Sequence, residues 1–341
     1  MAAMPRIKTT VVGSYPMPDW LPALPSEQAL LDATRAVIHT QEQAGIDLVC
    51  DGEFSRFDVN HPETNGMIEY FVRPMAGMRT AITFDELVAF RSQRGMGFRT
   101  RPPAVVDGPL GAGTLDLPHA CARSRRLTSK PFKFTLTGPH MLAKSVIDKH
   151  YGSVPDLAMA IGDVLAQQVK HVDADVVQID EANIPGSPDE WKWAAESLNR
   201  VLDAVRTAPA LHLCFGNYGG QTIQKGSWDR LIDYLNALHV DHVIMETAHR
   251  PAEELAAFRG LRPEIGFGLG VVDVKSTVIE TADTIARSIE RAENLLGPGR
   301  VRYIHPDCGF WMLKRNIADG KIQALSQGRD LYEGRAQPRS A

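Results

Sequence analysis

The chain has 341 residues, 44% of them hydrophobic, so it is long enough to bury a substantial core. Its 37 Lys and Arg against 41 Asp and Glu give a net charge of −4, which argues against a nucleic-acid-binding protein. The sequence shows no apolar run long enough for a membrane helix, no signal-peptide core and no paired cysteine spacing. We therefore expect a cytoplasmic protein with neither a membrane nor a nucleic acid as partner.

Short apolar runs recur along the chain, most of them ending in Gly, Asp, Glu or Cys. The runs are residues 9–14, 47–53, 132–139, 175–182, 211–217, 242–248, 266–274 and 302–309. Amphipathic stretches with helical periodicity lie between them, at residues 157–174, 228–240 and 281–297. Alternation of this kind is typical of βαβ units in a parallel sheet. Eight such runs in one series predict an α/β fold, a (βα)8 TIM barrel, rather than an open doubly wound sheet.

The regular spacing is interrupted once, between the second and third runs. Residues 61–131 contain many Pro, Gly and Arg residues and one further strand-like segment at 102–109. We interpret this region as an excursion from the barrel, made of a hairpin and loops that cover the site. The predicted organisation is therefore a single barrel domain over residues 1–341 with this insertion.

Polar side chains follow the apolar runs, where the carboxyl ends of barrel strands form the active-site face. They are Ser14, Asp51, Glu53, Asp180, Glu181, His212, Cys214, Glu246, Asp273, Lys275, Asp307 and Cys308. Apolar strands that end in acids, His and Cys are the pattern that a catalytic barrel requires.

A possible metal site is the most informative local feature. His212 and Cys214 share one face of a strand because they are two residues apart, and Glu246 and Cys308 end two other strands. Two thiolates, an imidazole and a carboxylate suit tetrahedral Zn²⁺. Core packing would explain His212 and Cys214 taken alone, but the equivalent positions of Glu246 and Cys308 favour a metal site. Cys50 is interpreted as a core residue.

The ordered motifs VGSYP, DGE, TGP, QIDEA, HLC, ET, GVVDVK and PDCG extend over about residues 7–330. This series resembles the catalytic C-terminal barrel of cobalamin-independent methionine synthase and its single-barrel relatives. The resemblance implies a zinc-dependent thiol methyltransferase in which His212, Cys214, Glu246 and Cys308 hold the metal. Zinc would deprotonate the substrate thiol and keep it nucleophilic.

The resemblance also implies residues that bind the thiol substrate. In the family, two acids of the GE and IDE motifs hold the amino group of homocysteine, and they match Glu53 and Asp180. Ser14 matches the segment that holds the carboxylate. A buried ammonium needs carboxylate partners, so these acids favour homocysteine as acceptor and methionine as product. Ion pairs that brace the end of the barrel are the alternative role for both acids.

Departures from the family pattern concern the methyl donor. The chain has no room for a second barrel, lacks the tryptophan expected after TGP, and has Lys275 where the family has a proton-donating His. These differences weaken the case for polyglutamylated methylfolate and leave a corrinoid protein, another methyl carrier or an activated small molecule as donor. Lys275 is expected to donate a proton, with a salt bridge to Asp273 or Glu246 as the alternative. Arg99 and Arg101 face either an anionic donor or solvent.

Three other functions compete with homocysteine methylation. An epoxyalkane:coenzyme M transferase would use the same zinc chemistry, but its sulfonate thiol would require cations where this chain has Glu53 and Asp180. A uroporphyrinogen decarboxylase-like enzyme would not need the zinc ligands. A purely structural zinc site would not explain the acids and Lys275 at the same end of the barrel.

Overall fold

A central parallel sheet organises the structure, a computed structural model that describes residues 6–56, 66–92, 101–217 and 220–334. Its strands are β1 (Lys8–Thr9), β4 (Lys133–Thr137), β6 (Val176–Asp180), β7 (Ala208–Leu213), β8 (His242–Met245), β9 (Gly266–Val272) and β10 (Val301–Pro306). They are hydrogen-bonded in the order β1-β10-β9-β8-β7-β6-β4, and every pair is parallel. The strands are almost entirely buried, which explains their continuous apolar character.

Residues 47–50 complete the sheet between β1 and β4. Leu48 forms a parallel bridge with Thr10, and Val49 forms one with Phe132. The Lys133 amide also donates to the Val49 carbonyl at 2.8 Å. This segment therefore takes the place of the second strand and closes the curled sheet, which confirms the predicted TIM-barrel fold.

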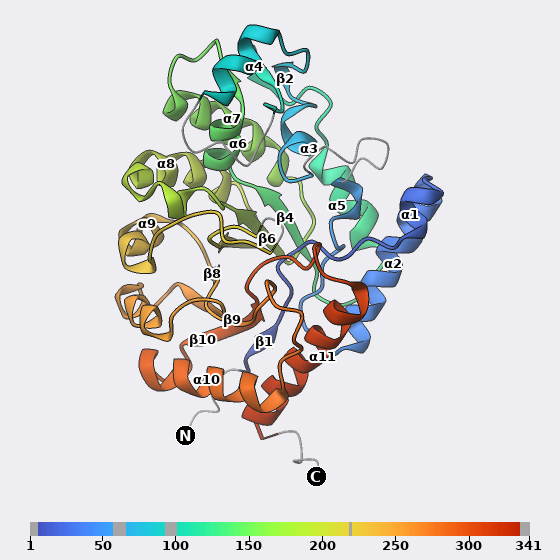
Figure 1. Ribbon diagram of the computed structural model, residues 1–341, viewed down its shortest axis with the longest axis vertical. Coiled ribbons are helices and arrows are strands. Elements are labelled where there is room, and N and C mark those ends of the chain that lie inside the picture. The colour runs from blue at the N-terminus through green and yellow to red at the C-terminus, as the bar shows by residue number, and fades with distance from the viewer. Residues whose placement is uncertain (1–5, 57–65, 93–100, 218–219, 335–341) are drawn as a thin grey trace.

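Helices surround the strands on the outside of the barrel (Figure 1). The helices are α1 (Trp20–Ala23), α2 (Glu27–Gln43), α3 (Glu69–Val72), α4 (Phe84–Arg91), α5 (Leu117–Arg125), α6 (Pro139–Ser145), α7 (Val154–Val169), α8 (Trp191–Leu202), α9 (Ile232–Ala237), α10 (Ala282–Leu296) and α11 (Arg315–Tyr332). Short 3₁₀ turns are η1 (Phe54–Arg56), η2 (Ile184–Gly186), η3 (Pro188–Glu190), η4 (Trp228–Leu231) and η5 (Ala252–Gly260).

Hydroxyl side chains fix where three of the long helices begin. Ser26, Ser153 and Thr281 each accept a backbone N–H from the first turn of α2, α7 and α10, respectively. The predicted helical stretches 157–174 and 281–297 correspond to α7 and α10. The stretch 228–240 contains η4 followed by the short α9 instead of one continuous helix.

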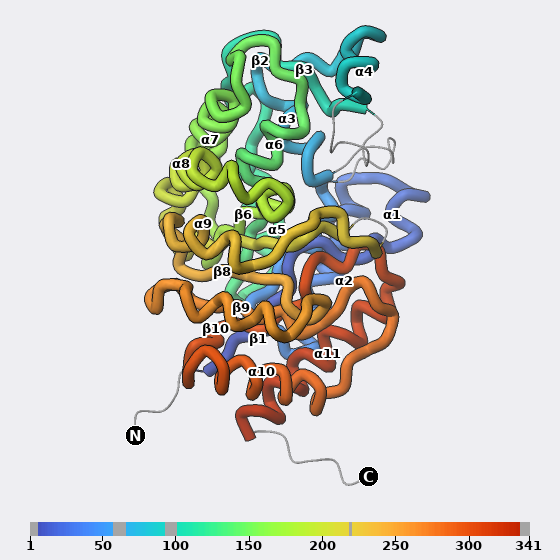
Figure 2. The backbone as a smooth tube through the Cα atoms, turned by 60° about the vertical axis from the view of Figure 1, so that its left-hand side comes forward, coloured from blue at the N-terminus to red at the C-terminus, as the bar shows by residue number. Residues whose placement is uncertain are grey.

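The region between the second and third barrel strands contains α3, α4, α5 and most of a small second sheet. Strand β2 (Ala76–Arg79) pairs antiparallel with β3 (Val105–Gly111), and β3 pairs parallel with β5 (Ile147–Asp148), which follows β4 in the chain. Arg79 of β2 forms ion pairs with Asp107 of β3 at 2.7 Å and Glu86 of α4 at 2.8 Å. Figures 1 and 2 show that β2, β3 and α4 lie at one end of the molecule, opposite α10 and α11.

Alternate glycines of β9 make room for side chains of β10 and of the residue that follows it. A Cβ at Gly268 would lie 3.0 Å from Nε2 of His305, and one at Gly270 would lie 2.1 Å from Oδ1 of Asp307. The segment 266–271 therefore owes its glycines to packing inside the barrel rather than to a bound nucleotide.

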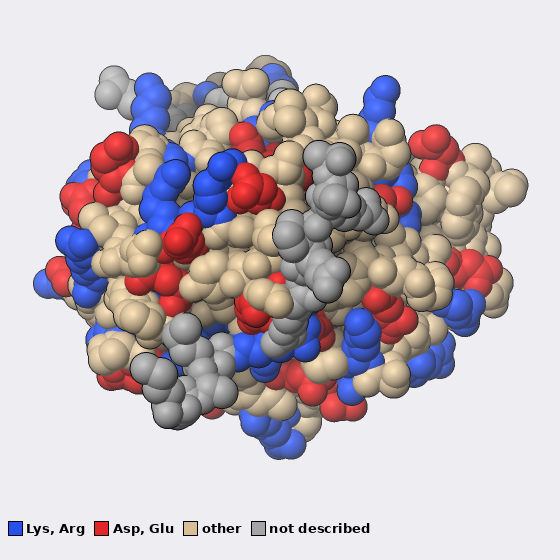
Figure 3. All heavy atoms as spheres, turned by 90° about the horizontal axis from the view of Figure 1, so that it is seen from below, with Lys and Arg blue, Asp and Glu red and all other residues tan. Residues whose placement is uncertain are grey.

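One face of the molecule is mixed in charge. Basic and acidic side chains are interspersed over the face shown in Figure 3, without the extended basic stripe typical of nucleic-acid-binding proteins. Within the described ranges, no helix is both long enough and apolar enough to cross a membrane.

Candidate active site

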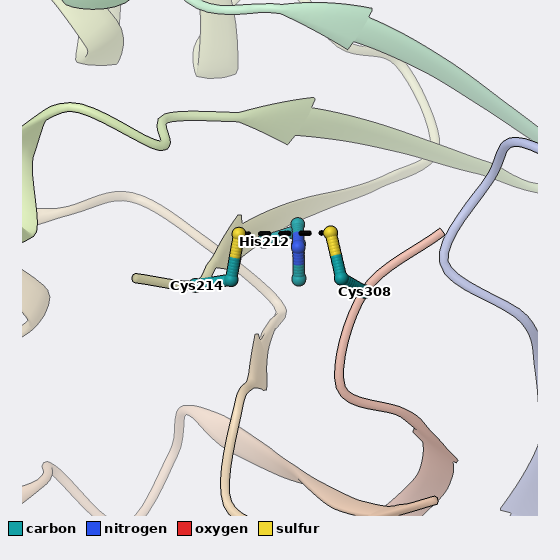
Figure 4. A group of neighbouring side chains, drawn as sticks. All are labelled: His212, Cys214 and Cys308. Atoms are coloured by element: carbon teal, nitrogen blue, oxygen red, sulfur yellow. Dashed lines mark hydrogen bonds between the residues drawn. The ribbon is translucent and has the colours of Figure 1, made fainter. Parts of the chain in front are cut away.

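Three potential metal ligands converge at the carboxyl ends of β7 and β10. The ligand atoms of His212, Cys214 and Cys308 all lie within 4.8 Å of one another. In Figure 4, a dashed line joins the two sulfur atoms, which point toward each other, and the imidazole is seen next to that line. The i, i+2 spacing on β7 brings His212 and Cys214 to the same side, and Cys308 reaches them from just beyond β10.

The protonation of His212 is set by its backbone partner. Its Nδ1 lies 3.0 Å from the carbonyl oxygen of Ile244, which can only accept, so Nδ1 carries the hydrogen. The lone pair of the imidazole is therefore on Nε2. This atom is buried without a hydrogen-bond partner within the described structure, as expected for a metal ligand.

The separation of the two thiols also fits a metal ion. Their sulfur atoms are 3.7 Å apart, and two 2.3 Å zinc–sulfur bonds at the tetrahedral angle would place them about 3.8 Å apart. The Cys308 sulfur and burial raise the pKa of the Cys214 thiol well above its ordinary value. A cation is thus needed to hold the Cys214 sulfur as a thiolate at neutral pH.

Glu246 lies at the same end of the barrel, but other groups hold both of its carboxylate oxygens. Oε2 accepts the backbone N–H of Phe215 at 2.8 Å, and Oε1 forms a buried ion pair with Lys275 Nζ at 2.9 Å. The structure therefore brings Glu246 and Lys275 together beside Cys214 without including Glu246 in the three-residue group. The Lys275 ammonium pairs with Glu246, whereas the described contact between Lys275 and the Asp273 carboxylate is through the Lys275 backbone N–H.

Glu53 owes its position to an unusual turn in the DGE segment. Gly52 and Glu53 have φ values of 73° and 63°, and Glu53 is the one non-glycine residue with a positive φ in the described ranges. The Asp51 carboxylate supports the turn by accepting the Glu53 N–H at 2.9 Å and the Ser124 hydroxyl at 3.0 Å. The turn leaves the Glu53 side chain buried, over the backbone of Gly13.

Buried polar groups surround the Glu53 carboxylate. Oε1 accepts the hydroxyl of Thr135 at 2.5 Å and forms an ion pair with Arg56 Nη1 at 3.1 Å. Arg56 was not among the predicted site residues. The opposite charges of Glu53 and Arg56, three residues apart in DGEFSR, could have indicated an ion pair. This ion pair corresponds to the alternative role given for Glu53, in which it braces the end of the barrel. Its partner, Arg56, lies beside the proposed substrate site.

Asp180 connects Glu53 to the metal ligands. It is the register partner of His212 on the neighbouring strand, and its Oδ1 accepts from Gln178 Nε2 at 2.7 Å. Burial raises the pKa of Asp180 to about 6; His212 opposes this increase, whereas Glu53 adds to it. Two buried acids are therefore close enough to interact next to the His-Cys-Cys group, an arrangement that favours a bound cation.

Ser14 lies at the same end of the barrel, against the loop that carries Cys308. A Cβ at Gly309 would lie 1.9 Å from Ser14 Oγ, and the Ser14 carbonyl accepts the Phe310 N–H at 2.8 Å. The structure thus places Ser14 next to the metal-ligand group, as its predicted role requires.

Asp307 has a role that the sequence did not reveal. Its carboxylate accepts three successive backbone N–H groups, from Thr247, Ala248 and His249, at 2.7–2.9 Å. Burial and the nearby Glu246 raise the pKa of Asp307 to about 7. Asp307 therefore fixes the loop that follows Glu246, and a carboxylate beside a cysteine in PDCG does not by itself indicate this contact.

The remaining candidates that the structure describes lie outside this cluster. Arg101 is exposed, and Arg99 lies outside the described residues. His140 is buried, with Nε2 2.8 Å from Glu190 and its ring stacked on Trp193. His305 is buried inside the barrel, and burial lowers its pKa to about 3. The buried environments of His140 and His305 therefore favour a structural role for both residues.

The chain is similar to known proteins over nearly its whole length. Residues 7–330 match the family model described as the catalytic domain of cobalamin-independent synthase. The methionine synthase of Pyrococcus abyssi is 30% identical, with 94% of this chain and 90% of the relative covered. The methionine synthase of Thermococcus kodakarensis is 29% identical, with 96% and 94% covered.

A solved structure has the same fold. The B12-independent methionine synthase from Shewanella sp. W3-18-1, in complex with selenomethionine, superposes with a TM-score of 0.78 at 24% identity, covering 97% of this chain and 98% of that one. The family match extends over nearly the whole chain and confirms the resemblance seen in the ordered motifs. The chain therefore belongs to the cobalamin-independent synthase catalytic-domain family and is a methyltransferase.

Proposed function

We propose that this protein transfers a methyl group to the sulfur of homocysteine, forming methionine, with Zn²⁺ held by His212, Cys214 and Cys308. The observation that carries the proposal is the placement of two buried acids, Glu53 and Asp180, beside these three ligands. When bound, Zn²⁺ would lower the pKa of the substrate thiol and keep its sulfur as a nucleophilic thiolate.

The acids support homocysteine rather than a sulfonate thiol. The α-ammonium of homocysteine would lie between Glu53 and Asp180, where carboxylates replace the water that it loses on binding. Ser14, against the Cys308 loop, is proposed to bind the substrate carboxylate. A sulfonate thiol would require free cations, whereas Arg56 is buried and already paired with Glu53.

We propose Glu246 as the fourth protein ligand and Lys275 as a proton donor to the leaving group. In the structure these side chains neutralise each other, with Nζ and Oε1 2.9 Å apart. Coordination by Glu246 would release the Lys275 ammonium from this pair. The freed ammonium would then be able to donate a proton near Cys214.

The first experiment measures the zinc content of the purified protein and the protons released on adding a thiol. One Zn²⁺ per chain is expected, with proton release on addition of homocysteine and none with coenzyme M. Cys308→Ser should lose zinc and proton release while keeping its circular dichroism spectrum. Cys121→Ser is the matched control because Cys121 is buried elsewhere, against the Asp173 carbonyl, and this variant should keep both.

The alternative results have distinct meanings. Release with coenzyme M alone would reject homocysteine as the acceptor. A wild-type chain that neither contains zinc nor takes it up would reject the metal proposal as a whole. Once the thiol is established, methylcobalamin and methyltetrahydrofolate, supplied in parallel, identify the class of methyl donor.

A further inference from the structure

Arg56 is a buried cation in an ion pair with Glu53 of the proposed amino-group site. Its Nη1 lies 3.1 Å from Glu53 Oε1, and its Nη2 donates to both the hydroxyl and the carbonyl of Thr135. The Thr135 hydroxyl donates in turn to the same Glu53 oxygen. Within the described structure, Arg56 and Thr135 both contact the Glu53 carboxylate at Oε1. They therefore orient the carboxylate and leave Oε2 for a ligand.

The backbone also connects Arg56 to Glu53. The Arg56 N–H donates to the Glu53 carbonyl at 3.0 Å, closing the turn η1 directly after the left-handed Glu53. A non-glycine residue keeps a positive φ only where its surroundings hold it, and such residues cluster at functional sites. The side chain and the backbone of Arg56 thus restrain the same strained residue.

Arg56 itself is out of reach of a ligand. Its side chain is 3% exposed, and its guanidinium carbon lies 5.3 Å, 5.8 Å and 6.0 Å from the ring centroids of Phe71, Phe134 and Tyr70. Any effect of Arg56 on the substrate must therefore act through Glu53. Phe71 and Tyr70 belong to α3, so the first helix of the excursion helps to hold the guanidinium in place.

Arg56 acts on both acids of the proposed amino-group site. Its guanidinium forms an ion pair with Glu53, and its positive charge favours the ionised form of Asp180. Without Arg56, the two acids would repel each other, and the orientation of Glu53 would no longer be restrained.

We propose that Arg56 is a positioning residue that orients Glu53 and thereby makes the site prefer a thiol with an amino group. This inference rests on the proposed function, because it assumes that Glu53 binds the ammonium of homocysteine. It adds a residue to the site that sets substrate specificity without touching the substrate.

The test compares the binding of two thiols to the zinc-loaded protein by titration calorimetry. The probes are homocysteine and 4-mercaptobutyrate, which differ only in the amino group. Wild type should bind homocysteine at least about tenfold more tightly, as expected for a charge-assisted contact. Arg56→Met should lose most of this preference, through weaker homocysteine binding with nearly unchanged 4-mercaptobutyrate binding. Arg56→Lys, which keeps the charge, should restore part of it.

Arg329→Met is the matched control. Arg329 is equally buried and pairs with Asp47 at 2.6 Å, on the segment that leads into the second strand of the barrel rather than at its carboxyl end. This variant should lower the melting temperature without changing the ratio of the two dissociation constants. If Arg56→Met does not fold, the same comparison is made with Arg56→Lys.

The possible failures are distinguishable. Equal weakening of both thiols by the Arg56 variants, or an unchanged ratio, would overturn the positioning role while leaving homocysteine as the substrate. A wild-type protein with no preference for homocysteine over 4-mercaptobutyrate would overturn the proposed amino-group site and this inference together.

Discussion

Replacing Gly13 with Ala tests the position of Glu53 directly. A Cβ at Gly13 would lie 2.1 Å from Glu53 Oε1, 2.9 Å from its carboxylate carbon and 3.5 Å from Thr135 Cγ2. Carbon and oxygen atoms without a bond between them do not approach within about 3 Å, so the Glu53 carboxylate must move by about 1 Å. That movement would pull it away from the Arg56 and Thr135 contacts.

The expected magnitude follows from this displacement. A misplacement of about 1 Å in a binding or catalytic group can reduce activity about 100-fold, so we expect homocysteine to bind about 10 to 100 times more weakly. Overpacking should also lower the free energy of unfolding by about 1–3 kcal/mol. Titration calorimetry on the zinc-loaded variant measures the affinity, and urea denaturation measures the stability.

Gly108→Ala is the control, because a Cβ there would meet nothing closer than 3.7 Å. It should bind homocysteine like wild type. If the dissociation constant of Gly13→Ala for homocysteine is also within about twofold of the wild-type value, the position of the Glu53 carboxylate does not determine substrate binding.

Three further predictions concern charged groups and the metal. Lys275→Met leaves the buried Glu246 carboxylate without its cation, and urea denaturation should show a loss of about 3 kcal/mol in the metal-free protein; an unchanged unfolding curve would mean that the pair is not formed in solution. Burial acts to raise the pKa of Glu190, but hydrogen bonds from His140 and Lys144 prevail and lower it to about 2. The stabilisation from this carboxylate is therefore complete above about pH 5 and lost toward pH 2. After allowance for solvent screening, the free energy of unfolding of Glu190→Gln should be about 1–2 kcal/mol below that of wild type at pH 7. In acid, the variant and wild type should become equally stable. Thermal melts from pH 7 to pH 3 measure this difference, and a difference that does not depend on pH would contradict it. Removing the metal with a chelator should abolish homocysteine-dependent proton release without unfolding the barrel, whereas unfolding, seen by circular dichroism, would assign the metal a structural role.

Much of the fold was predictable because the patterns that specify it are local. Buried parallel strands read as continuous apolar runs, and their alternation with amphipathic helices determines the order of the βαβ units. The i, i+2 spacing of His212 and Cys214 likewise places both side chains on one face of β7 without knowledge of any other strand. The order of the motifs was enough to identify the family.

Contacts between distant segments were decided only by the tertiary structure. The second barrel strand is joined to each neighbour by a single bridge, and the small sheet includes β5, which follows β4 in the sequence. The Glu246 oxygens are held by Lys275 and the Phe215 backbone, so the role of Glu246 as a metal ligand stays a prediction.

The hydrogen bonds of the Glu53 side chain also depend on the tertiary structure rather than on local sequence. Residues 53 and 135 are 82 positions apart, and the hydrogen bond between them exists only because β4 lies next to the second strand. Residue types and local periodicity determined which elements form and which side chains gather at the carboxyl end of the barrel. The closure of the barrel decided which donor faces which acceptor, because hydrogen bonds and ion pairs depend on distances of about 3 Å that local sequence patterns do not specify.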